Sequence, residues 1–388
     1  MVRALEFKLT EEQEDIKAAV REFCEKEFTE DVIRRYCERE EFPMDIYRKA
    51  CQLGFIGIHI PEEYGGQGLG VLENVLVAEE MCRADPELGI TLVLADFGAE
   101  LILKFGTEEQ KEEWLVPVFK GESLSAAAFT EPSGGSDISK RLGTVARREG
   151  SGWVINGTKT FITNANLSRY VITLCQTDLE VEPPYRGQSL FIVPTSSEGL
   201  DVVKMPGKLG IRPSQTCEVS YSDVRVSGEA LLGELNRGFY HTLAFLNESR
   251  IEIAAQGVGV AQGAFDRALE YAKERTLFGK PLIELQAVSH KIAWMATKIE
   301  AARLLTYKAA WLTDQGKPDP MISSMAKWYA ARVAVEVVDE AAQIFGGYFY
   351  FEDYDIQRFY RVAKIIEIYE GTKEVQKDTV ARFLAKRA

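Results

Sequence analysis

The sequence predicts a mostly α-helical protein with a β domain inserted between two helical domains. In the first third of the chain, charged segments carry apolar residues at helical spacing. The next hundred or so residues consist of short runs of β-branched and aromatic residues separated by turns. The remainder returns to long segments with an apolar stripe, as in a helical bundle. We therefore expect three domains, at residues 1–121, 122–235 and 236–388.

The first domain begins with a helix-capping pattern. Thr10 and Gln13 form a capping box ahead of a charged amphipathic segment, which predicts a helix over residues 11–28. The apolar pattern predicts further helices over residues 44–53, 72–83 and 88–105.

The sequence pattern of the middle domain is typical of an all-β sandwich or barrel. Asn156-Gly157 lies between two strand-like runs, which predicts a hairpin turn at that dipeptide. Further strand-like runs cover residues 171–174, 189–193 and 217–221.

The last domain is predicted to consist of helices over residues 239–274, 282–313, 322–345 and 354–369. The first of these segments contains Gly257, Gly259 and Gly263, and this run of glycines partly resembles a dinucleotide-binding fingerprint. The spacing differs and no strand precedes it, so close packing against another helix is the better interpretation.

Composition and charge argue against a nucleic-acid-binding protein and against a membrane protein. The formal net charge is -13, and nucleic-acid-binding proteins usually present a basic face, so we expect no nucleic-acid partner. A local basic pocket for a phosphorylated cofactor remains open. The N-terminus has no apolar signal segment and no long apolar stretch is free of charges, so we expect no membrane insertion.

The 6 cysteines are scattered, without a Cys-x-x-Cys pair or a histidine at ligand spacing. This pattern favours neither a disulfide framework nor a metal site. We therefore expect no metal and a reducing, cytoplasmic environment.

A carboxylate stands where one C-terminal helix is expected to end and the next to begin. Apolar residues at helical spacing over residues 362–369 place Glu370 in the last turn of that helix. Gly371 permits a reversal of the chain, and Thr372 can cap the following helix. Taken alone, Glu370 is most simply a solvated carboxylate at a helix end.

The junction reads Tyr369-Glu370-Gly371-Thr372, with Glu374 and Gln376 following. This motif resembles the C-terminal signature of the flavin-dependent acyl-CoA dehydrogenases, and further matches span nearly the whole chain. The resemblance implies an N-terminal helical domain, a middle β-barrel-like domain and a C-terminal four-helix bundle. It also implies FAD-dependent α,β-dehydrogenation of an acyl-CoA, in which Glu370 removes the α-proton and flavin N5 takes the β-hydride. An electron-transferring flavoprotein is the implied electron acceptor.

Two segments resemble the family's flavin-contacting loop and strand. Residues 126–137 hold hydroxyls and backbone N–H groups that suit a flavin edge and a pyrophosphate, although such residues after a proline also form ordinary turns. Residues 157–164 resemble the strand beside the isoalloxazine ring, with Phe161 where many members have tryptophan. The resemblance assigns flavin contacts to Ala127, Phe129, Thr130, Ser136, Phe161, Ile162 and Thr163.

Other residues resemble those that reach the adenine and pyrophosphate side of FAD. By resemblance these are Arg275, Gln286, Gln343, Gly346 and Gly347. The resemblance also assigns Phe278, Thr372 and Glu374 to FAD binding. Arg275 alone would be read as a solvated cation at a helix end. In the family this FAD belongs partly to a neighbouring subunit, so the resemblance implies a homo-oligomer, a tetramer. The aromatic run at residues 348–351 departs from the family's usual Asn-Gly-Tyr.

Substrate contacts follow from the same resemblance. CoA recognition is assigned to Asn247 and Arg250, with Ser136 and Gly371. Some members place their catalytic glutamate immediately before this arginine. Ser249 occupies that position here, which leaves Glu370 as the candidate base.

Asp96 interrupts an apolar run that aligns with the family's acyl-pocket helix. A buried acid is costly unless it has a partner or a function. One interpretation is that it caps a neighbouring helix. The other is a second catalytic carboxylate acting on a ring carbon, as in members resembling cyclohexane- and cyclohexene-carboxyl-CoA dehydrogenases. A short or branched acyl chain is the alternative substrate. A non-catalytic scaffold, or a lyase or desulfinase on the same fold, remains an alternative function.

Overall fold

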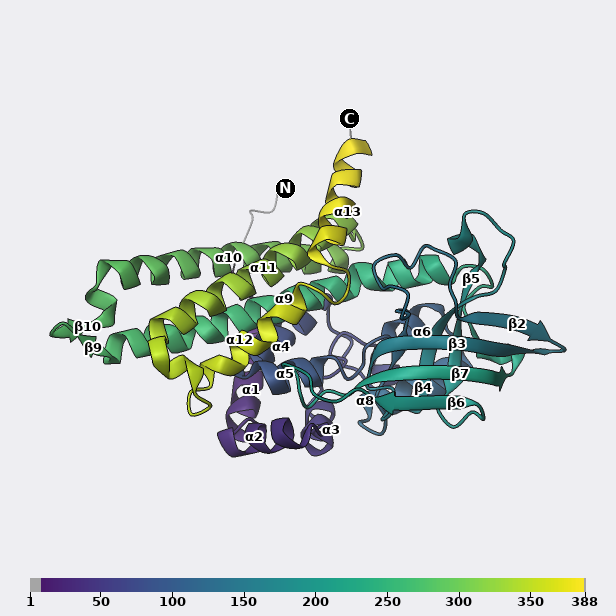
Figure 1. Cartoon of the computed structure of the whole chain (residues 1–388), viewed down its shortest axis with the longest axis horizontal. Helices are drawn as coiled ribbons and strands as arrows, with labels where there is room; N and C mark the ends of the chain where they lie inside the picture. Colours follow the sequence, from purple (N-terminus) through teal and green to yellow (C-terminus); the bar gives the residue numbers. More distant parts are fainter. Residues whose placement is uncertain (1–7, 387–388) are drawn as a thin grey trace.

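The computed structural model describes residues 8–386, and its architecture is the predicted one. Two helical regions flank a β domain. Figure 1 shows the sheet at one end of the long C-terminal helices and a small β-hairpin at their opposite end. The fold class expected from the sequence is therefore confirmed.

The N-terminal helices are short and surround the start of the bundle. Gln13 N–H donates to Thr10 Oγ1 at 3.2 Å and closes the predicted capping box. The helices are α1 (Glu11–Glu27), α2 (Glu30–Arg39), α3 (Met44–Gln52), α4 (Val71–Ala84), α5 (Pro86–Val93), α6 (Ala99–Phe105), α7 (Glu108–Gln110) and α8 (Val116–Phe119). The single helix predicted over residues 88–105 is wrong. A turn at residues 94–98 divides it: α5 ends at Val93, and Gly98, with a φ of 93° that a helix interior does not allow, precedes the start of α6.

The β domain is one mostly antiparallel sheet with the order β6-β7-β3-β2-β4-β5-β8, to which β1 adds beside β4. Its strands are β1 (Ala127–Ala128), β2 (Val145–Glu149), β3 (Gly152–Thr163), β4 (Tyr170–Gln176), β5 (Gln188–Pro194), β6 (Leu200–Lys204), β7 (Thr216–Val226) and β8 (Leu231–Leu232).

The hairpin predicted at Asn156-Gly157 is wrong, because β3 runs through this dipeptide. The pairing with β7 shifts register between Ile155 and Gly157, so the glycine marks a β-bulge. A Cβ atom on Gly157 would lie 2.5 Å from Thr144 Cα. Close approach of the neighbouring backbone therefore explains this glycine better than a turn does.

The C-terminal bundle is built around its longest helix, α9 (Gly238–Glu274). It continues through β9 (Thr276–Leu277), β10 (Lys280–Pro281), α10 (Gln286–Asp314), α11 (Pro320–Phe345), α12 (Ile356–Ile366) and α13 (Lys373–Lys386). Cβ atoms on Gly259 and Gly263 would lie 2.3 Å from backbone oxygens of α4. The interpretation of these glycines as helix-packing residues is therefore confirmed.

The apolar core runs through both helical regions and continues beneath one face of the sheet, and a second cluster fills the other face. All 6 cysteines are buried and free. None of the described helices is long and apolar enough to span a bilayer.

Candidate active site

Glu370 lies in the turn between α12 and α13, and not in the last turn of a helix as predicted. Helix α12 ends at Ile366, and the chain then reverses direction. Glu370 has a φ of 57° and Gly371 a φ of 88°. A left-handed conformation is uncommon for a glutamate and persists only where its surroundings enforce it.

Side chains from three helices enforce this turn. Lys327 Nζ on α11 donates to the carbonyl oxygens on either side of Glu370, at 2.7 Å and 2.8 Å. Gln376 Nε2 on α13 donates to the Glu370 carbonyl oxygen at 3.0 Å, and Arg250 Nε on α9 does so at 3.3 Å. The backbone around Glu370 is therefore fixed by two donors that are distant in sequence, Lys327 and Arg250, and by the nearby Gln376.

The Glu370 carboxylate is partly hydrogen-bonded and partly free. Ser249 Oγ donates to Oε2 at 2.8 Å. Oε1 is buried and has no hydrogen-bond partner among residues 8–386. Burial raises the pKa of Glu370 to about 7, although the Ser249 hydrogen bond and the charges of Arg250 and Lys327 oppose this shift. Such a carboxylate is suited to accept a proton near neutral pH.

Arg250 and Thr372 also contribute to this turn. Arg250 is buried and donates to Asn247 Oδ1 at 3.4 Å, in addition to its bond with the Glu370 carbonyl. Thr372 Oγ1 accepts from Val375 N–H at 3.4 Å and thereby caps α13, as expected from the sequence.

Asp96 lies in the turn between α5 and α6 and is only 7% exposed. Burial raises its pKa to about 7, the Glu100 charge adds to the shift, and His59 opposes it. No other described residue donates a hydrogen bond to its carboxylate. The residue at the N-cap of α6 is Gly98, so Asp96 does not cap that helix.

Further acidic and basic groups, which were not predicted as site residues, lie near Asp96. His59 Nε2 lies 3.7 Å from Glu100 Oε1. Glu252 on α9 accepts from Asn74 Nδ2 at 3.1 Å. Burial raises the pKa of Glu252, and the charges of Asp96 and Glu100 add to that rise. A signal for Glu252 was present in the sequence, since it is an acid between isoleucines in an otherwise apolar stretch of α9.

The two segments expected to contact flavin lie side by side. Thr160 N–H donates to the Thr130 carbonyl oxygen at 3.0 Å, and Lys159 Nζ donates to the Phe129 carbonyl oxygen at 3.1 Å. Phe161 has a φ of 59° and is 64% exposed. The strand therefore presents a flat apolar side chain beside backbone polar groups, an arrangement that fits a flavin ring. Ala127, Ile162 and Thr163 belong to the same two segments, and Ser136 is exposed on the loop.

Neighbouring aromatic rings link the segments expected to contact flavin with the turn of Asp96 and with the part of α9 that contacts Glu370. The Phe97 ring, next to Asp96, lies 5.2 Å from that of Phe245 and 6.5 Å from that of Phe129. Phe245 precedes Ser249 by about one turn of α9. The flavin loop, the Asp96 turn and the Glu370 turn thus converge at one end of the bundle.

The residues expected at the adenine side of FAD lie elsewhere. Arg250 and Arg275 are separated by about 37 Å along α9, at 1.5 Å per residue. Phe278 is 90% exposed at the tip of the β9–β10 hairpin, at the end of the bundle opposite the sheet (Figure 1). One chain therefore does not bring the two groups of predicted FAD residues together.

The adenine-side residues gather around this distant end. Arg275 lies over the Tyr348 ring at 5.4 Å, and Gln286 begins α10. Gln343, Gly346 and Gly347 line a hollow of about 380 Å³ beside the aromatic run, where Tyr350 is 82% exposed. Glu374, by contrast, is exposed on α13 near the Glu370 turn.

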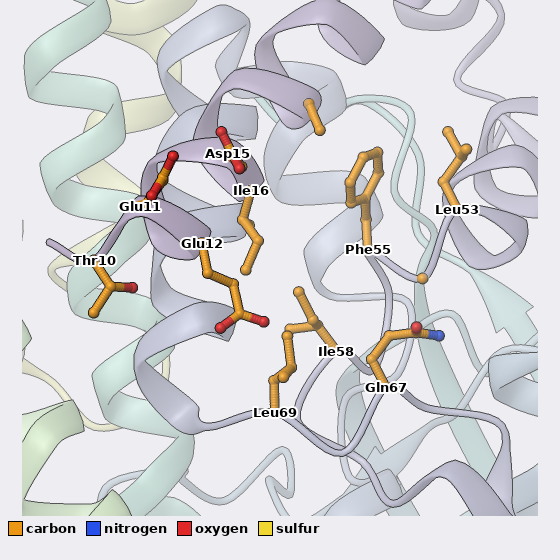
Figure 2. Close-up of a pocket in the computed structure, with 12 residues that line it drawn as sticks. Thr10, Glu11, Glu12, Asp15, Ile16, Leu53, Phe55, Ile58, Gln67 and Leu69 are labelled. Carbon is orange, nitrogen blue, oxygen red and sulfur yellow. The ribbon is translucent and has the colours of Figure 1, made fainter.

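A separate groove of about 840 Å³ opens beside the start of α1 (Figure 2). Apolar side chains from α1 and from the segments after α3 form its walls, and three carboxylates of α1 lie beside them. These groove residues include Glu11, Glu12, Asp15, Ile16, Leu53, Phe55, Ile58 and Leu69. The groove contains none of the site residues expected from the sequence.

Comparison with known proteins identifies the family. The models for the N-terminal, middle and C-terminal domains of acyl-CoA dehydrogenases match residues 10–122, 126–224 and 236–385. The chain is 42% identical to a short-chain specific acyl-CoA dehydrogenase of Clostridium acetobutylicum, over 96% of this chain and 98% of the relative. It is 40% identical to a caffeyl-CoA reductase–Etf complex subunit of Acetobacterium woodii, over 97% of this chain and 99% of the relative.

A solved structure agrees with these matches. Butyryl-CoA dehydrogenase of Megasphaera elsdenii superposes with a TM-score of 0.92 at 39% identity, covering 98% of this chain and 100% of that structure. Together with the matched domain models, this similarity shows that the chain belongs to the acyl-CoA dehydrogenase family.

Proposed function

We propose that Glu370 is the base that removes the α-proton of an acyl-CoA thioester in an FAD-dependent α,β-dehydrogenation. The observation that carries this proposal is the Glu370 carboxylate itself. It is held on a fixed turn, has one buried oxygen without a described partner, and has a pKa of about 7. These are the properties required of a base that acts near neutral pH.

An α-C–H group is a weak acid, so its removal also requires stabilisation of charge on the thioester oxygen. The Glu370 backbone N–H has no acceptor among residues 8–386 and is available as one such donor. Ser249 keeps Oε2 oriented while Oε1 remains free to receive the proton. The chain thus supplies both a base and a donor from the same turn.

Members of this family are FAD-dependent, and the residues present fit that cofactor. Phe161 and the loop of Phe129 and Thr130 would hold the ring system. FAD supplies the acceptor for the β-hydride when it is bound. The role of each of these residues is part of the proposal.

The direct test uses the purified protein under anaerobic conditions. We expect a yellow protein with FAD bound, whose flavin absorbance falls when an acyl-CoA substrate is added. A colourless protein that cannot be reconstituted with FAD would instead support a scaffold role. Bound FAD that is never reduced, together with acyl-CoA turnover, would support lyase or desulfinase chemistry.

An electron-transferring flavoprotein is the proposed electron partner. The Acetobacterium woodii relative is named as part of a reductase–Etf complex, which supports this assignment. The same relative is named a reductase, so the direction of the reaction depends on the potential of the partner. Measuring flavin reduction by acyl-CoA and flavin oxidation by enoyl-CoA with the same preparation determines which direction is faster.

A ring-containing carboxyl-CoA is the proposed substrate, with Asp96 as the second catalytic carboxylate. With such a substrate Asp96 removes the one proton, from a ring carbon remote from the thioester, while flavin takes the hydride, and Glu370 removes no proton. No described residue other than Asp96 itself, through its backbone N–H, donates a hydrogen bond to this carboxylate. This supports a functional role, because a structural carboxylate so deeply buried normally has partners from neighbouring residues. The test is a panel of butyryl-, octanoyl-, isobutyryl-, glutaryl- and cyclic carboxyl-CoA esters. Preference for a straight-chain or simple branched ester would replace the ring assignment.

We propose a homotetramer in which FAD bridges two chains. The distance between the two groups of predicted FAD residues, and the exposure of Phe278 and Tyr350 at one end of the bundle, support such an assembly. Sedimentation is expected to give four chains with flavin bound. A monomer with full flavin occupancy would contradict the shared site.

A further inference from the structure

Lys327 is a fully buried lysine on α11 whose contacts concentrate on the Glu370 turn. Its exposed fraction is 0%. Nζ donates to the carbonyl oxygens of Tyr369 and Gly371, the residues that flank Glu370. Within the part of the chain that the structure describes, no carboxylate lies close enough to pair with it directly. A buried cation without a direct ion pair is costly, so its retention calls for a reason.

Holding the backbone does not by itself require a positive charge. Gln376 is also buried, and its neutral amide donates to the carbonyl oxygens of Glu370 and Gly371 at 3.0 Å and 3.1 Å. A neutral donor therefore already performs the same kind of contact on the same turn. What Lys327 adds, and Gln376 does not, is an ammonium group that can carry a charge, held by the backbone on both sides of Glu370.

We propose that Lys327 is a positioning residue that fixes the Glu370 turn and whose ammonium group, when protonated, favours the ionised form of Glu370 that accepts the substrate proton. This inference rests on the proposed function, because it assigns a purpose to the ionised form of Glu370. It concerns a residue on another helix that touches neither of the Glu370 carboxylate oxygens. Lys327 acts through the turn and through its charge.

The electrostatic environment agrees with this role. Burial lowers the pKa of Lys327 to about 7, and the Glu370 charge is the main influence that opposes the shift. The charge of Lys327 in turn opposes the upward shift of Glu370. Because the charges of Lys327 and Glu370 interact, each measured titration midpoint describes the pair and not one residue alone. The other charged groups that influence the pair are Arg250, Glu100, Glu252, Glu367 and Glu374.

The test compares Lys327→Met with Gln376→Met. Both variants remove a donor to the Gly371 carbonyl oxygen, but only the first removes a charge. Loss of a nearby positive charge raises the pKa of Glu370, so the rising limb of flavin reduction against pH should move upward by about one pH unit. Gln376→Met should lower the rate without moving this midpoint. Lys377→Met, an exposed lysine on the same helix as Gln376, serves as the surface control.

A second readout does not depend on turnover. The infrared C=O stretch of the protonated Glu370 carboxyl, identified by its absence in Glu370→Gln, can be titrated directly. In Lys327→Met this band should persist to a pH about one unit higher than in the wild type. Lys327→Arg keeps the charge and should leave the midpoint near that of the wild type. If Lys327→Met does not fold, Lys327→Gln provides the same comparison with a neutral donor retained.

The outcomes separate the inference from the function on which it rests. Equal midpoints in wild type and Lys327→Met, by both readouts, would overturn the role of the Lys327 charge while leaving Glu370 as the base. Normal flavin reduction in Glu370→Gln would instead remove the proposed function. A shift of equal size in Gln376→Met would show that disturbance of the turn, and not charge, moves the titration.

Discussion

The turns that contain Glu370 and Asp96 place two buried carboxylates in very different surroundings. Burial raises the pKa of both to about 7. The Glu370 turn receives hydrogen bonds from α9, α11 and α13, whereas no other described residue donates to the Asp96 carboxylate. Burial alone thus raises the pKa of a carboxylate enough for it to take a proton near neutral pH, whereas hydrogen-bond partners fix where that carboxylate lies. Under the proposed function, Glu370 removes the α-proton of straight-chain and branched acyl groups, and Asp96 removes a ring proton from cyclic acyl groups that reach it.

The largest effect that distinguishes the two turns is expected from Asp96→Asn. With cyclohexane- or cyclohexene-carboxyl-CoA, loss of a catalytic carboxylate should slow flavin reduction by about 10²- to 10⁴-fold. With butyryl-CoA the rate should change little, because only Glu370 is needed. Stopped-flow absorbance of the flavin measures both rates on one preparation. Equal rates for wild type and variant with every ester would return Asp96 to a structural role.

A second prediction concerns the effect of the Asp96 carboxyl on the free energy of unfolding. The pKa of Asp96 is raised to about 7 in the folded chain, above its ordinary value near 4. Between these values the folded state binds more protons than the unfolded state, so this group lowers stability as pH rises through the window. Asp96→Asn removes that penalty.

The Asn variant should accordingly be more stable than the wild type at pH 8, by about 4 kcal/mol. The difference should shrink as pH falls towards 3, below both pKa values, where Asp96 is protonated in both states. Thermal unfolding at several pH values measures it. An Asn variant that is less stable than wild type at pH 8 would mean that the ionised carboxylate has a partner.

The smallest effect is expected from Ser249→Ala. The Ser249 hydroxyl donates to Glu370 Oε2 and lowers the pKa of that carboxyl, against the larger effect of burial. Without this hydrogen bond the midpoint of flavin reduction should rise by about half a pH unit, and the rate at pH 7 should fall a few-fold. A pH profile of the flavin reduction rate detects both changes. A downward shift would contradict the assigned direction of this hydrogen bond.

Patterns that repeat along the chain were predicted well. The long helices of the bundle follow from apolar periodicity, and the capping box at Thr10 follows from local hydrogen bonding. Gly259 and Gly263 were identified as packing residues because small side chains share one face of α9. These features depend on residues within a few positions of one another, which a sequence shows directly.

Features that depend on distant residues were predicted poorly. Glu370 was placed within a helix because apolar spacing continues to Tyr369, but donors from α9, α11 and α13 stabilise a left-handed turn there. Asn156-Gly157 has the composition of a hairpin, yet pairing with β7 makes it a bulge. In both cases tertiary contacts override the local preference, and the sequence carries no local signal of those contacts.

The central claim is that Glu370 removes the α-proton, and the most direct test is flavin reduction in Glu370→Gln. Because glutamine keeps the size of the side chain, FAD content and acyl-CoA binding should match those of the wild type. Absorbance of the bound flavin is followed after anaerobic addition of the acyl-CoA that reduces the wild type fastest. This reduction should slow by 10²-fold or more with straight-chain and branched esters, whose α-proton Glu370 removes. Reduction at the wild-type rate, with FAD bound, would contradict this claim.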